Sequence, residues 1–244
     1  MNNYFHDINF PETAVYDSIR TYGKKPFHLQ DHLKRLENSA KLLGFELPES
    51  RESISQKVLK EIDATDFDPQ FLKIIATPKN IFLENRPLRI DPSVYEGVKV
   101  LSVTMSRGLV KCKRVRSPGL EESYQQALSI GYYEALLKDP HQYLTEGTRS
   151  NILWIESGRL HYCDHALTGI TQAEIIKIAE KLSITVSQGV LPYHHLKTID
   201  ELFLTQTTRG VVPILTVDHI EIGDGKAGEQ TKLFMSHYQK MTSS

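Results

Sequence analysis

The sequence predicts a two-domain α+β protein, with a small α/β N-terminal domain and a larger, strand-rich α/β C-terminal domain. Its 244 residues suit one large domain or two modest ones and can bury a real core. Two helix-spaced segments and a few strand-like runs occupy the first hundred residues, whereas short apolar runs dominate the rest. A basic stretch with Gly and Pro, MSRGLVKCKRVRSPG, separates these patterns. We therefore expect domains over 1–105 and 119–244, joined by a connector over 106–118.

The composition is that of an ordinary soluble globular protein, with 40% hydrophobic and 24% charged residues. The net charge of −1 provides no field that favours nucleic acid or an anionic membrane. Two cysteines do not make a disulfide framework and suit a reducing compartment. No apolar run approaches the length of a membrane span, and the first residues lack a secretory pattern. We therefore expect a cytoplasmic protein with no membrane or nucleic-acid partner.

The first domain should contain two helices and three strands. Apolar residues recur every three or four positions from Leu29 to Leu43, which predicts a helix that ends at Gly44. A weaker helical pattern covers 51–62. A turn at Gly23-Lys24 should end the first strand. The expected strands are 14–22, 71–77 and 98–104, with a brief connection around 77–87 between the two middle ones.

The second domain should be mostly strands. Ser157-Gly158 predicts a hairpin turn between two of them. Thr171 and Glu174 have the spacing of a capping box at the start of a helix. The other expected helices are 119–130 and 227–241, and the expected strands are 133–137, 151–156, 159–163, 184–190, 201–206 and 212–217.

The basic stretch offers a candidate nucleophile. In an extended conformation, Lys111 and Lys113 would share one face. A desolvated lysine beside other cations loses its proton readily and forms Schiff bases with carbonyl groups. The alternative is a solvated basic connector. No aromatic residues interleave the stretch, which argues against nucleic-acid binding.

Three features could bind a phosphate. Small polar residues precede a helix at 168–174, where free N–H groups and the helix dipole favour an anion. Hydroxyls and a glycine follow a strand at 205–210, although a plain polar turn has the same composition. Arg35, beside the leucine stripe, could add a fixed guanidinium fork, although such an arginine is more often a surface residue.

Two other patterns are set aside. His161, Cys163 and His165 alternate and could face a metal together, but no fourth ligand is in register, so we expect no metal. The glycine-rich stretch at 223–228 lacks the spacing of a nucleotide-binding P-loop.

Five segments in order resemble the class IV fold type of pyridoxal-phosphate enzymes, which includes branched-chain aminotransferases, D-amino-acid aminotransferases and aminodeoxychorismate lyases. The resemblance covers most of the chain and implies a two-domain D-amino-acid aminotransferase-like fold with a cofactor-binding C-terminal domain. The segments are YDSIRTYGKKPFHLQDHLKRLENSAKLLG (16–44), YLTEGTRSNILWI (143–155), LTGITQAEI (167–175), FLTQTTRGVVPI (203–214) and IGDGKAGEQTKLF (222–234).

The resemblance also implies roles. A lysine about thirty residues before the motif's glutamate holds pyridoxal 5'-phosphate as a Schiff base, which indicates Lys113, with Lys111 the fallback. Glu146 matches the residue that bonds the pyridine nitrogen, and Arg35 matches the phosphate-binding arginine. A carboxylate there keeps the ring nitrogen protonated, so that the ring can accept electrons while the released lysine moves a proton.

The remaining matches concern the phosphate and the substrate. Ile170 and Thr171 match the helix start that binds the phosphate, and Thr207 matches the hydroxyl of the last phosphate loop. Arg149 stands where small residues are more usual, and it could meet a substrate carboxylate or face solvent. The residues implied to lie toward the substrate are Tyr16, Thr208, Arg209 and Arg149.

The chain also departs from the pattern. Arg116 stands where members often carry a hydroxyl or amide residue, which leaves the partner of the cofactor's 3-hydroxyl open. The chain is short for the family, so the substrate does not transfer. We expect an aminotransferase that moves an amino group between an amino acid and a 2-oxo acid. An aminodeoxychorismate lyase making 4-aminobenzoate and pyruvate and a non-catalytic homologue are the alternatives. The resemblance also implies a homodimer.

Overall fold

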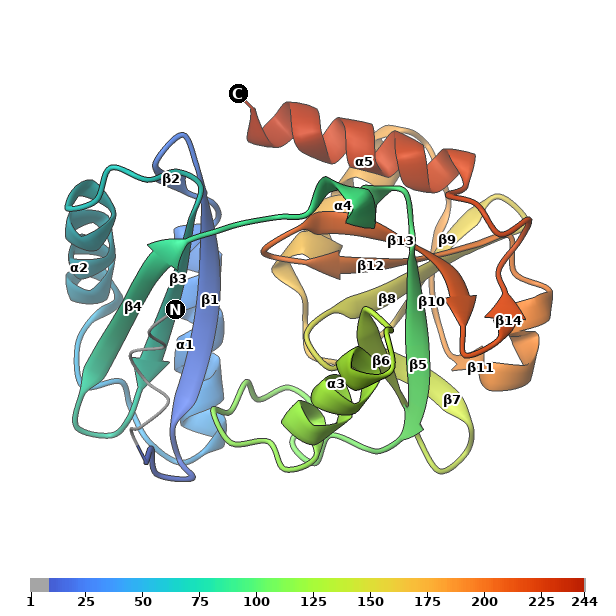
Figure 1. The fold of residues 1–244 in the computed structure, drawn as a ribbon. Coiled ribbons are helices and arrows are strands. Elements are labelled where there is room, and N and C mark those ends of the chain that lie inside the picture. The colour runs from blue at the N-terminus through green and yellow to red at the C-terminus, as the bar shows by residue number, and fades with distance from the viewer. Residues whose placement is uncertain (1–8, 244) are drawn as a thin grey trace. The chain divides into compact units, whose positions relative to one another are not determined.

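The computed structural model describes residues 9–243, which form two compact units (Figure 1). The first unit runs to Arg89 and also includes Lys111–Arg116. The second unit comprises Ile90–Val110 and Ser117–Thr242. The chain therefore crosses from one unit to the other three times, and the short basic segment belongs with the first unit.

The predicted domain limits, 1–105, 106–118 and 119–244, stay a prediction, because compactness alone does not locate an independently folding domain. Within the described residues, no helix combines the length and the apolar character needed to cross a membrane. The expectation about a secretory pattern rests partly on the first eight residues, which lie outside the described range.

The first unit is a four-stranded antiparallel sheet in the order β2-β1-β3-β4, with two helices on one face. Apolar residues of both helices share a core with alternate residues of two strands, including Val15, Ile19 and Leu72. This shared core places both helices on the same face of the sheet. The elements are β1 (Val15–Tyr22), β2 (Lys25–Pro26), α1 (Leu29–Leu42), α2 (Arg51–Asp63), β3 (Gln70–Ala76) and β4 (Ile81–Pro87).

The leucine stripe is confirmed as the buried face of α1, with Leu29, Leu33, Leu36 and Ala40 in the core. The expected connection around 77–87 is wrong. Most of it is strand β4, which pairs along the whole of β3 and forms the edge of the sheet. An edge strand needs only partial burial, so its sequence lacks the long apolar run that signals a central strand.

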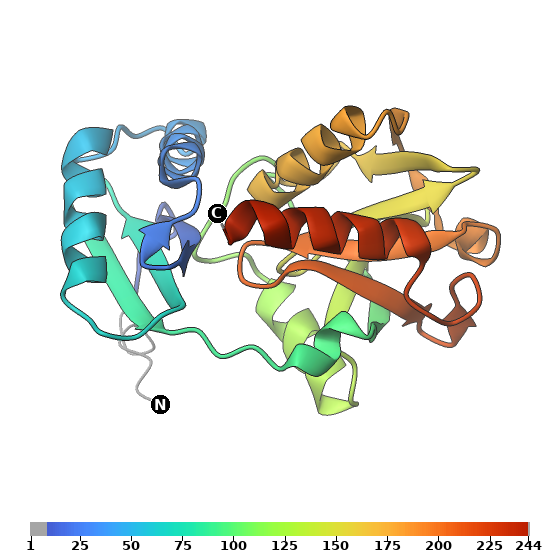
Figure 2. The same ribbon diagram turned by 90° about the horizontal axis from the view of Figure 1, so that it is seen from above.

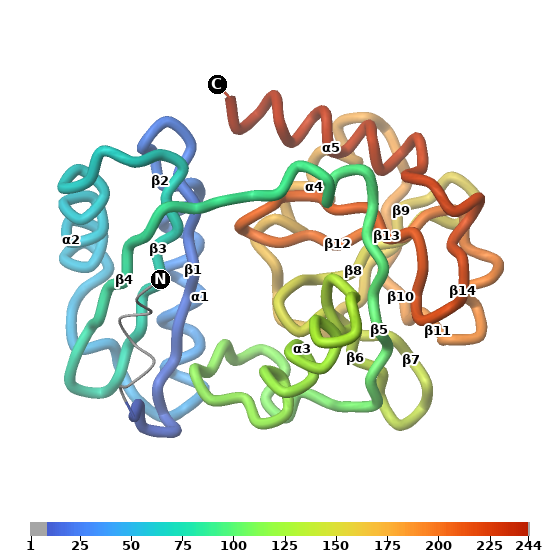
Figure 3. Tube along the Cα trace, in the orientation of Figure 1, coloured from blue at the N-terminus to red at the C-terminus, as the bar shows by residue number. Residues whose placement is uncertain are grey.

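The second unit has a ten-stranded sheet that follows the order β10-β9-β8-β12-β13-β5-β6-β7-β11. An additional pairing between β7 and β8 joins the path into a ring of six strands, which can be followed in Figure 3. The elements are η1 (Pro92–Tyr95), β5 (Val98–Thr104), α3 (Leu120–Ser129), β6 (Glu134–Lys138), β7 (Tyr143–Gly147), β8 (Asn151–Glu156), β9 (Arg159–Cys163), α4 (Ile170–Lys181), β10 (Val186–Gly189), β11 (Leu191–Pro192), η2 (Tyr193–Lys197), β12 (Glu201–Gln206), β13 (Gly210–Val217), β14 (Ile220–Glu221) and α5 (Glu229–Thr242).

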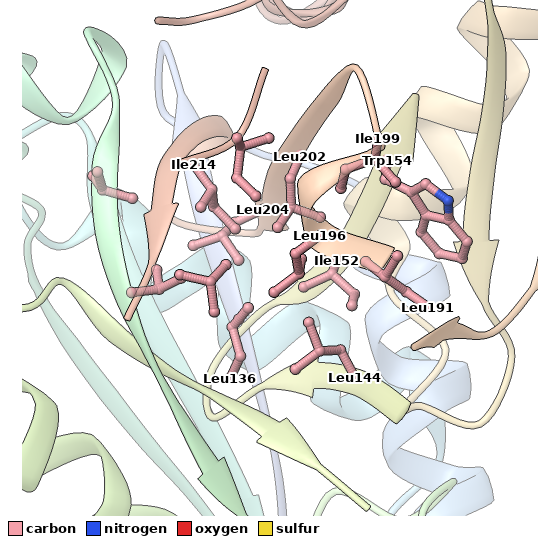
Figure 4. Packing of buried hydrophobic residues seen from close by; sticks show 14 of the residues in the cluster. Leu136, Leu144, Ile152, Trp154, Leu191, Leu196, Ile199, Leu202, Leu204 and Ile214 are labelled. Atoms are coloured by element: carbon pink, nitrogen blue, oxygen red, sulfur yellow. The ribbon is translucent and has the colours of Figure 1, made fainter. Parts of the chain in front are cut away.

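Every strand of the ring contributes alternate residues to one apolar cluster (Figure 4). Strand alternation then turns the intervening residues to the outer face of the ring. Phe203, between two cluster residues of β12, packs on Phe234 of α5 with 5.8 Å between ring centroids. The cluster members from the ring strands are Val98, Val100, Leu136, Leu144, Ile152, Trp154, Leu202, Leu204, Val212, Ile214 and Val217.

Helices cover this outer face. Helices α4 and α5 lie side by side, and both contact β12, as Figure 2 shows for the pair of helices. Helix α3 packs on β5 and β6. The ring thus presents one set of side chains to its apolar interior and another to the starts and faces of these helices.

Two local predictions for the second unit have different outcomes. The hairpin turn at Ser157-Gly158 is confirmed, with φ of 51° and 73°. The capping box of Thr171 and Glu174 is wrong, because α4 begins at Ile170 and Gly169 is its N-cap. Gln172 accepts a hydrogen bond from the Gly169 N–H at 3.4 Å, so only this half of a capping box forms, two residues earlier than predicted, because Gly169 has no side chain to accept the other bond.

Candidate active site

The predicted lysine lies beside the first strand of the first unit. The Tyr16 N–H donates to the Lys113 carbonyl at 2.9 Å, and the Val115 N–H donates to the Ala14 carbonyl at 2.9 Å. These two hydrogen bonds hold the backbone of Lys113 beside the start of β1. The Lys113 Nζ lies 4.7 Å from the centre of the Tyr16 ring. Lys113 is half-buried there, whereas Lys111 is exposed in a turn.

Arg35 is held by a buried carboxylate in the same unit. Asp17 lies on the helix-facing side of β1, between the core residues Val15 and Ile19. Arg35 donates to both Asp17 carboxylate oxygens, from Nε and from Nη2, at 2.7 Å each. His32 Nδ1 lies 2.8 Å from Asp17 Oδ1. Asp17, on strand β1 of the sheet, therefore orients the guanidinium of the predicted Arg35.

The charges in this cluster compensate one another. Burial opposes the charge of Asp17, but the Arg35 guanidinium and the His32 ring hold the pKa of that carboxyl well below its usual range. Burial lowers the pKa of His32 even though Asp17 opposes the shift. We therefore expect a neutral His32, an ionised Asp17 and a charged Arg35 near neutral pH.

In the second unit, a one-residue irregularity turns Glu146 out of the apolar ring. Leu137 pairs with Glu146, whereas the next residue, Lys138, pairs with Leu144. Thr145 is the extra residue of this bulge. Without it, strict alternation from the core residue Leu144 would aim Glu146 into the apolar interior. The bulge instead places it beside Leu137, on the outer face.

Glu146 has a cationic neighbour and a backbone donor. Arg107 Nε lies 3.0 Å from Glu146 Oε1, and both side chains are buried. The Arg107 Nε–H is not aligned as a hydrogen bond, so the contact is ionic. Glu146 Oε2 accepts from the Leu167 N–H at 3.3 Å. The carboxylate therefore occupies a buried site that receives positive charge and N–H donors.

The same outer face carries the start of α4. Asn151 pairs with Glu146 across the strands and donates to the Leu167 carbonyl at 2.6 Å. Thr205 pairs with Asn151 from the other side. Among the described residues, the buried Thr205 Oγ1 and Gln172 Nε2 have no hydrogen-bond partner. Unmet polar atoms thus lie around Asn151, at the helix start and the end of β12.

A second buried carboxylate fixes the turn between β7 and β8. Glu134 accepts from the Thr148 hydroxyl at 3.2 Å, from the Ser150 hydroxyl at 3.0 Å and from the Arg149 N–H. Burial raises the pKa of Glu134. A Cβ at Gly147 would lie 2.2 Å from the Ser150 hydroxyl, so only glycine fits this turn. Glu134 therefore positions the chain directly after Glu146.

The Arg149 side chain is already paired. Its Nη2 donates to the two Glu121 carboxylate oxygens at 2.9 and 3.2 Å, and its guanidinium lies 3.6 Å from the centre of the Tyr124 ring. Both partners belong to α3. In this structure the side chain thus meets α3, and the predicted substrate contact stays a prediction.

The other predicted residues fall into two groups. Lys113, Arg35 and Tyr16 belong to the first unit, where Lys113 and Tyr16 are in contact. In the second unit, Glu146 contacts the Leu167 peptide, which lies three residues before Ile170, the first residue of α4, and Thr171 follows Ile170. Thr207, Thr208 and Arg209 form the half-buried turn between β12 and β13.

Several site residues escaped sequence reasoning. Asp17 could have been found, because it occupies a core position in the alternation of β1. Arg107 could not, because it is one of several basic residues in an irregular segment. Arg116, which leaves the partner of the 3-hydroxyl open, donates to Asn9. Residues 9–243 contain no cluster of three or more His, Cys, Asp or Glu side chains arranged for a metal.

Comparison with known proteins identifies the family. The sequence model of the amino-transferase class IV family matches residues 14–217. This chain belongs to the class IV aminotransferases. The putative branched-chain-amino-acid aminotransferase of Methanocaldococcus jannaschii is 28% identical over 243 residues, covering 90% of this chain and 83% of the relative. The probable branched-chain-amino-acid aminotransferase of Thermotoga maritima is 28% identical over 235 residues, covering 93% and 85%.

Solved structures of class IV aminotransferases share the fold. The T.th. branched-chain amino acid aminotransferase with pyridoxamine 5'-phosphate superposes with a TM-score of 0.84 at 25% identity, covering 95% of this chain and 86% of that one. A putative 4-amino-4-deoxychorismate lyase from Legionella pneumophila gives 0.85 at 21% identity, covering 94% and 91%. The two-domain α+β fold expected from the sequence is confirmed, and the likeness to the lyase concerns the fold alone.

The buried His32 should make stability depend on pH. Its pKa in the folded state lies below the ordinary value of 6.5. Below pH 6.5 the unfolded chain therefore takes up a proton that the folded chain refuses, and the free energy of unfolding falls as pH falls, by at most about 1.4 kcal/mol per pH unit. Urea unfolding between pH 7.5 and 5.5 measures this slope. His32→Gln should flatten it, and the exposed His219→Gln should keep it; an unchanged slope in His32→Gln would contradict the prediction.

Proposed function

We propose that this class IV aminotransferase carries pyridoxal 5'-phosphate and transfers an amino group between an amino acid and a 2-oxo acid. The observation that carries the proposal is the buried Glu146, turned outward by a bulge and lying 3.0 Å from a guanidinium. Such a carboxylate suits a protonated ring nitrogen. The T.th. relative was solved with the pyridoxamine form of this cofactor.

The donor set fits this cofactor. A pyridoxal phosphate needs an anion-binding end and a carboxylate at its ring nitrogen. The start of α4 and the end of β12 supply buried donors that lack partners among the described residues. Thr205 lies two strand pairings from Glu146, and Glu146 itself accepts from the Leu167 N–H, three residues before the start of α4. This spacing supports a ligand whose two ends differ in charge.

We assign roles by family match and local geometry. Glu146 would bind the ring nitrogen, and Ile170, Thr171 and Thr207 would bind the phosphate. Arg35, oriented by Asp17, would add a guanidinium to the phosphate. Lys113 is favoured over Lys111 because it is half-buried against Tyr16, whereas Lys111 is exposed. Tyr16, Thr208, Arg209 and Arg149 would lie toward the substrate.

The bound cofactor would supply an electron sink for the pair left when the substrate Cα–H bond breaks. Glu146 lies against the Arg107 guanidinium and would hold the ring-nitrogen proton by hydrogen bonding. Lys113 Nζ would accept the proton lost from the Cα of the donor amino acid. In the second half of the transfer it would donate a proton to the Cα of the new amino acid. Asp17 and Glu134 act through neighbours, by orienting Arg35 and the turn after Glu146.

The same family likeness supports a homodimer in the cytoplasm, and sedimentation velocity of the purified protein would test the dimer. The lyase and the non-catalytic homologue remain alternatives for the test below. No contact among the described residues favours either over amino transfer.

Amino transfer itself is tested with the cofactor-loaded protein. We expect glutamate and at least one further amino acid to exchange amino groups with 2-oxo acids, measured by chromatography of both products. Aminodeoxychorismate offered alone should give no 4-aminobenzoate. Release of 4-aminobenzoate and pyruvate without an amino acceptor would replace the transferase by the lyase. A colourless protein after incubation with pyridoxal phosphate would favour the non-catalytic homologue.

The covalent attachment separates the two lysines. We expect Lys113→Ala to lose the absorbance band that bound pyridoxal phosphate gives at the visible edge of the near-ultraviolet, and to lose nearly all transfer activity. Lys111→Ala should keep the band, because its side chain is exposed. Borohydride reduction followed by peptide mapping locates the attachment independently. A labelled peptide carrying Lys111 would reverse the assignment.

The charge of Glu146 should affect turnover more than attachment. Glu146→Gln keeps the size of the side chain but cannot stabilise a protonated ring nitrogen, so we expect the absorbance band to persist and kcat to fall by about 10²- to 10³-fold. Glu146→Asp, which keeps the charge, should retain more activity, and the exposed Glu180→Gln is the matched control. Thermal unfolding of each variant separates loss of folding from loss of chemistry. Near wild-type turnover in Glu146→Gln would refute the assigned role.

A further inference from the structure

The segment that carries Lys113 is held by the first strand of its unit. Residues Lys111–Arg116 belong to the first unit but to none of its helices or named strands. The Lys113 carbonyl accepts from the Tyr16 N–H at 2.9 Å, and an isolated antiparallel bridge pairs Arg114 with Val15 of β1. These contacts fix the segment against β1 alone, so the position of Lys113 relative to α1 depends on a further contact.

Helix α1 provides that contact through one residue, Ser39. Its Oγ accepts from the Lys113 N–H at 3.1 Å, and its carbonyl accepts from the Cys112 thiol at 3.4 Å. Ser39 and Cys112 are both fully buried. The Lys113 N–H is thus bound by the helix and the Lys113 carbonyl by the strand. Both polar groups of the Lys113 main chain have partners, and Ser39 supplies one of them.

Neither the helix nor the core explains a serine at this position. Ser39 lies on the buried face of α1, next to Ala40. Alanine has the higher helix propensity, whereas a buried hydroxyl costs free energy unless it is hydrogen-bonded. In a regular α-helix the Ser39 carbonyl would accept from the Leu43 N–H. That N–H instead donates to the Ala40 carbonyl at 3.0 Å, so the Ser39 carbonyl is available to the Cys112 thiol.

The anchored main chain determines where the Lys113 amine can reach. A lysine side chain has a flexible four-carbon stem, so its amine is placed only if the stem starts from a fixed main chain. Lys113 Nζ lies 4.7 Å from the centre of the Tyr16 ring, and the Tyr16 N–H also holds the Lys113 carbonyl. Ser39 and Tyr16 therefore fix the base of the stem from α1 and from β1. Lys111, two residues earlier, is exposed in a turn.

We propose that Ser39 is a positioning residue for Lys113, which it holds by the main-chain N–H so that the amine meets the cofactor aldehyde. The inference rests on the proposed function, because it takes Lys113 as the residue that carries the cofactor. In the attachment, the amine and the aldehyde condense to a Schiff base and release one water. The rate of such a reaction depends steeply on the placement of the two groups. Ser39 acts through Lys113 and supplies no group to the reaction.

Amide hydrogen exchange of the full-length protein, with and without cofactor, tests the contact itself. Ser39→Ala removes the acceptor but keeps a good helix former, so the chain should fold. The Lys113 amide hydrogen should then exchange about tenfold faster, because its hydrogen bond to Ser39 is lost. NMR of protein labelled with ¹⁵N-lysine measures this rate, and Lys113→Arg identifies the signal. The amide of Lys73, in β3, is the internal reference and should keep its rate.

Kinetics test the consequence for the amine. In Ser39→Ala, attachment of pyridoxal 5'-phosphate, followed by growth of its absorbance band, should slow by about tenfold. The kcat of amino transfer should fall by about tenfold to hundredfold with little change in KM. Ser39→Thr keeps the hydroxyl and should recover most of both rates, and Ser55→Ala makes the matched change on α2 and should behave as the wild type does. A purely structural serine would change thermal unfolding without this split between kcat and KM.

The outcomes separate this proposal from the proposed function. Wild-type exchange of the Lys113 amide in Ser39→Ala, or faster exchange without slower attachment, would overturn the role of Ser39. A cofactor attached to Lys111 would also overturn it and would leave amino transfer standing. A wild type that transfers no amino group, with attachment slowed in Ser39→Ala, would refute amino transfer and keep the role of Ser39. If thermal unfolding shows that Ser39→Ala has lost its fold, Ser39→Cys, whose sulfur is a weak acceptor, takes its place with the same expectations.

Discussion

The extra residue in β7 is the constraint on which the candidate site depends. Strand alternation would otherwise send Glu146 into the same apolar cluster as Leu144, where an unpaired carboxylate costs several kcal/mol or is neutralised. The bulge at Thr145 moves Glu146 to the outer face, beside Asn151. The β7–β8 pairing that closes the strand ring is formed by these same two residues. The same pairing therefore closes the ring of strands and holds the Glu146 carboxylate on the outer face.

The buried polar groups near the candidate site fall into two classes. Some have hydrogen-bond partners within the fold, and others have none in the described part of the chain and are available to a ligand. Glu134 is satisfied by three donors from the turn after Glu146, and Asp17 is satisfied by His32 and Arg35. These two carboxylates orient the side chains and N–H groups that donate hydrogen bonds to them. The Thr205 hydroxyl and the Gln172 amide are buried without partners among the described residues, which a fold tolerates poorly unless a ligand meets them.

The sequence predicted the elements with strong periodicity and missed those defined by pairing. The leucine stripe of α1 and the turn at Ser157-Gly158 carry local signals, and the structure bears out both. Strand β4 carries little signal because an edge strand is only half covered. The site motif around Glu146 could be found from its resemblance to the family, but its outward aim depends on a bulge set by pairing with β6, which no local pattern encodes. Arg107 was missed for the same reason, since its role arises only when the chain folds back on β7.

The family match and the individual side chains answer different questions about substrate choice. Two relatives at 28% identity are named as a putative and a probable branched-chain-amino-acid aminotransferase, and a neighbour named as a putative lyase has a similar TM-score. A shared scaffold of this kind accommodates more than one substrate, because function is set by site residues rather than by the fold. Arg149 and Arg209 both lie on turns next to Glu146 or Thr205, yet Glu121 compensates only the first. The pairing of each arginine is thus a property of this chain's own side chains, which the identity to a relative does not give.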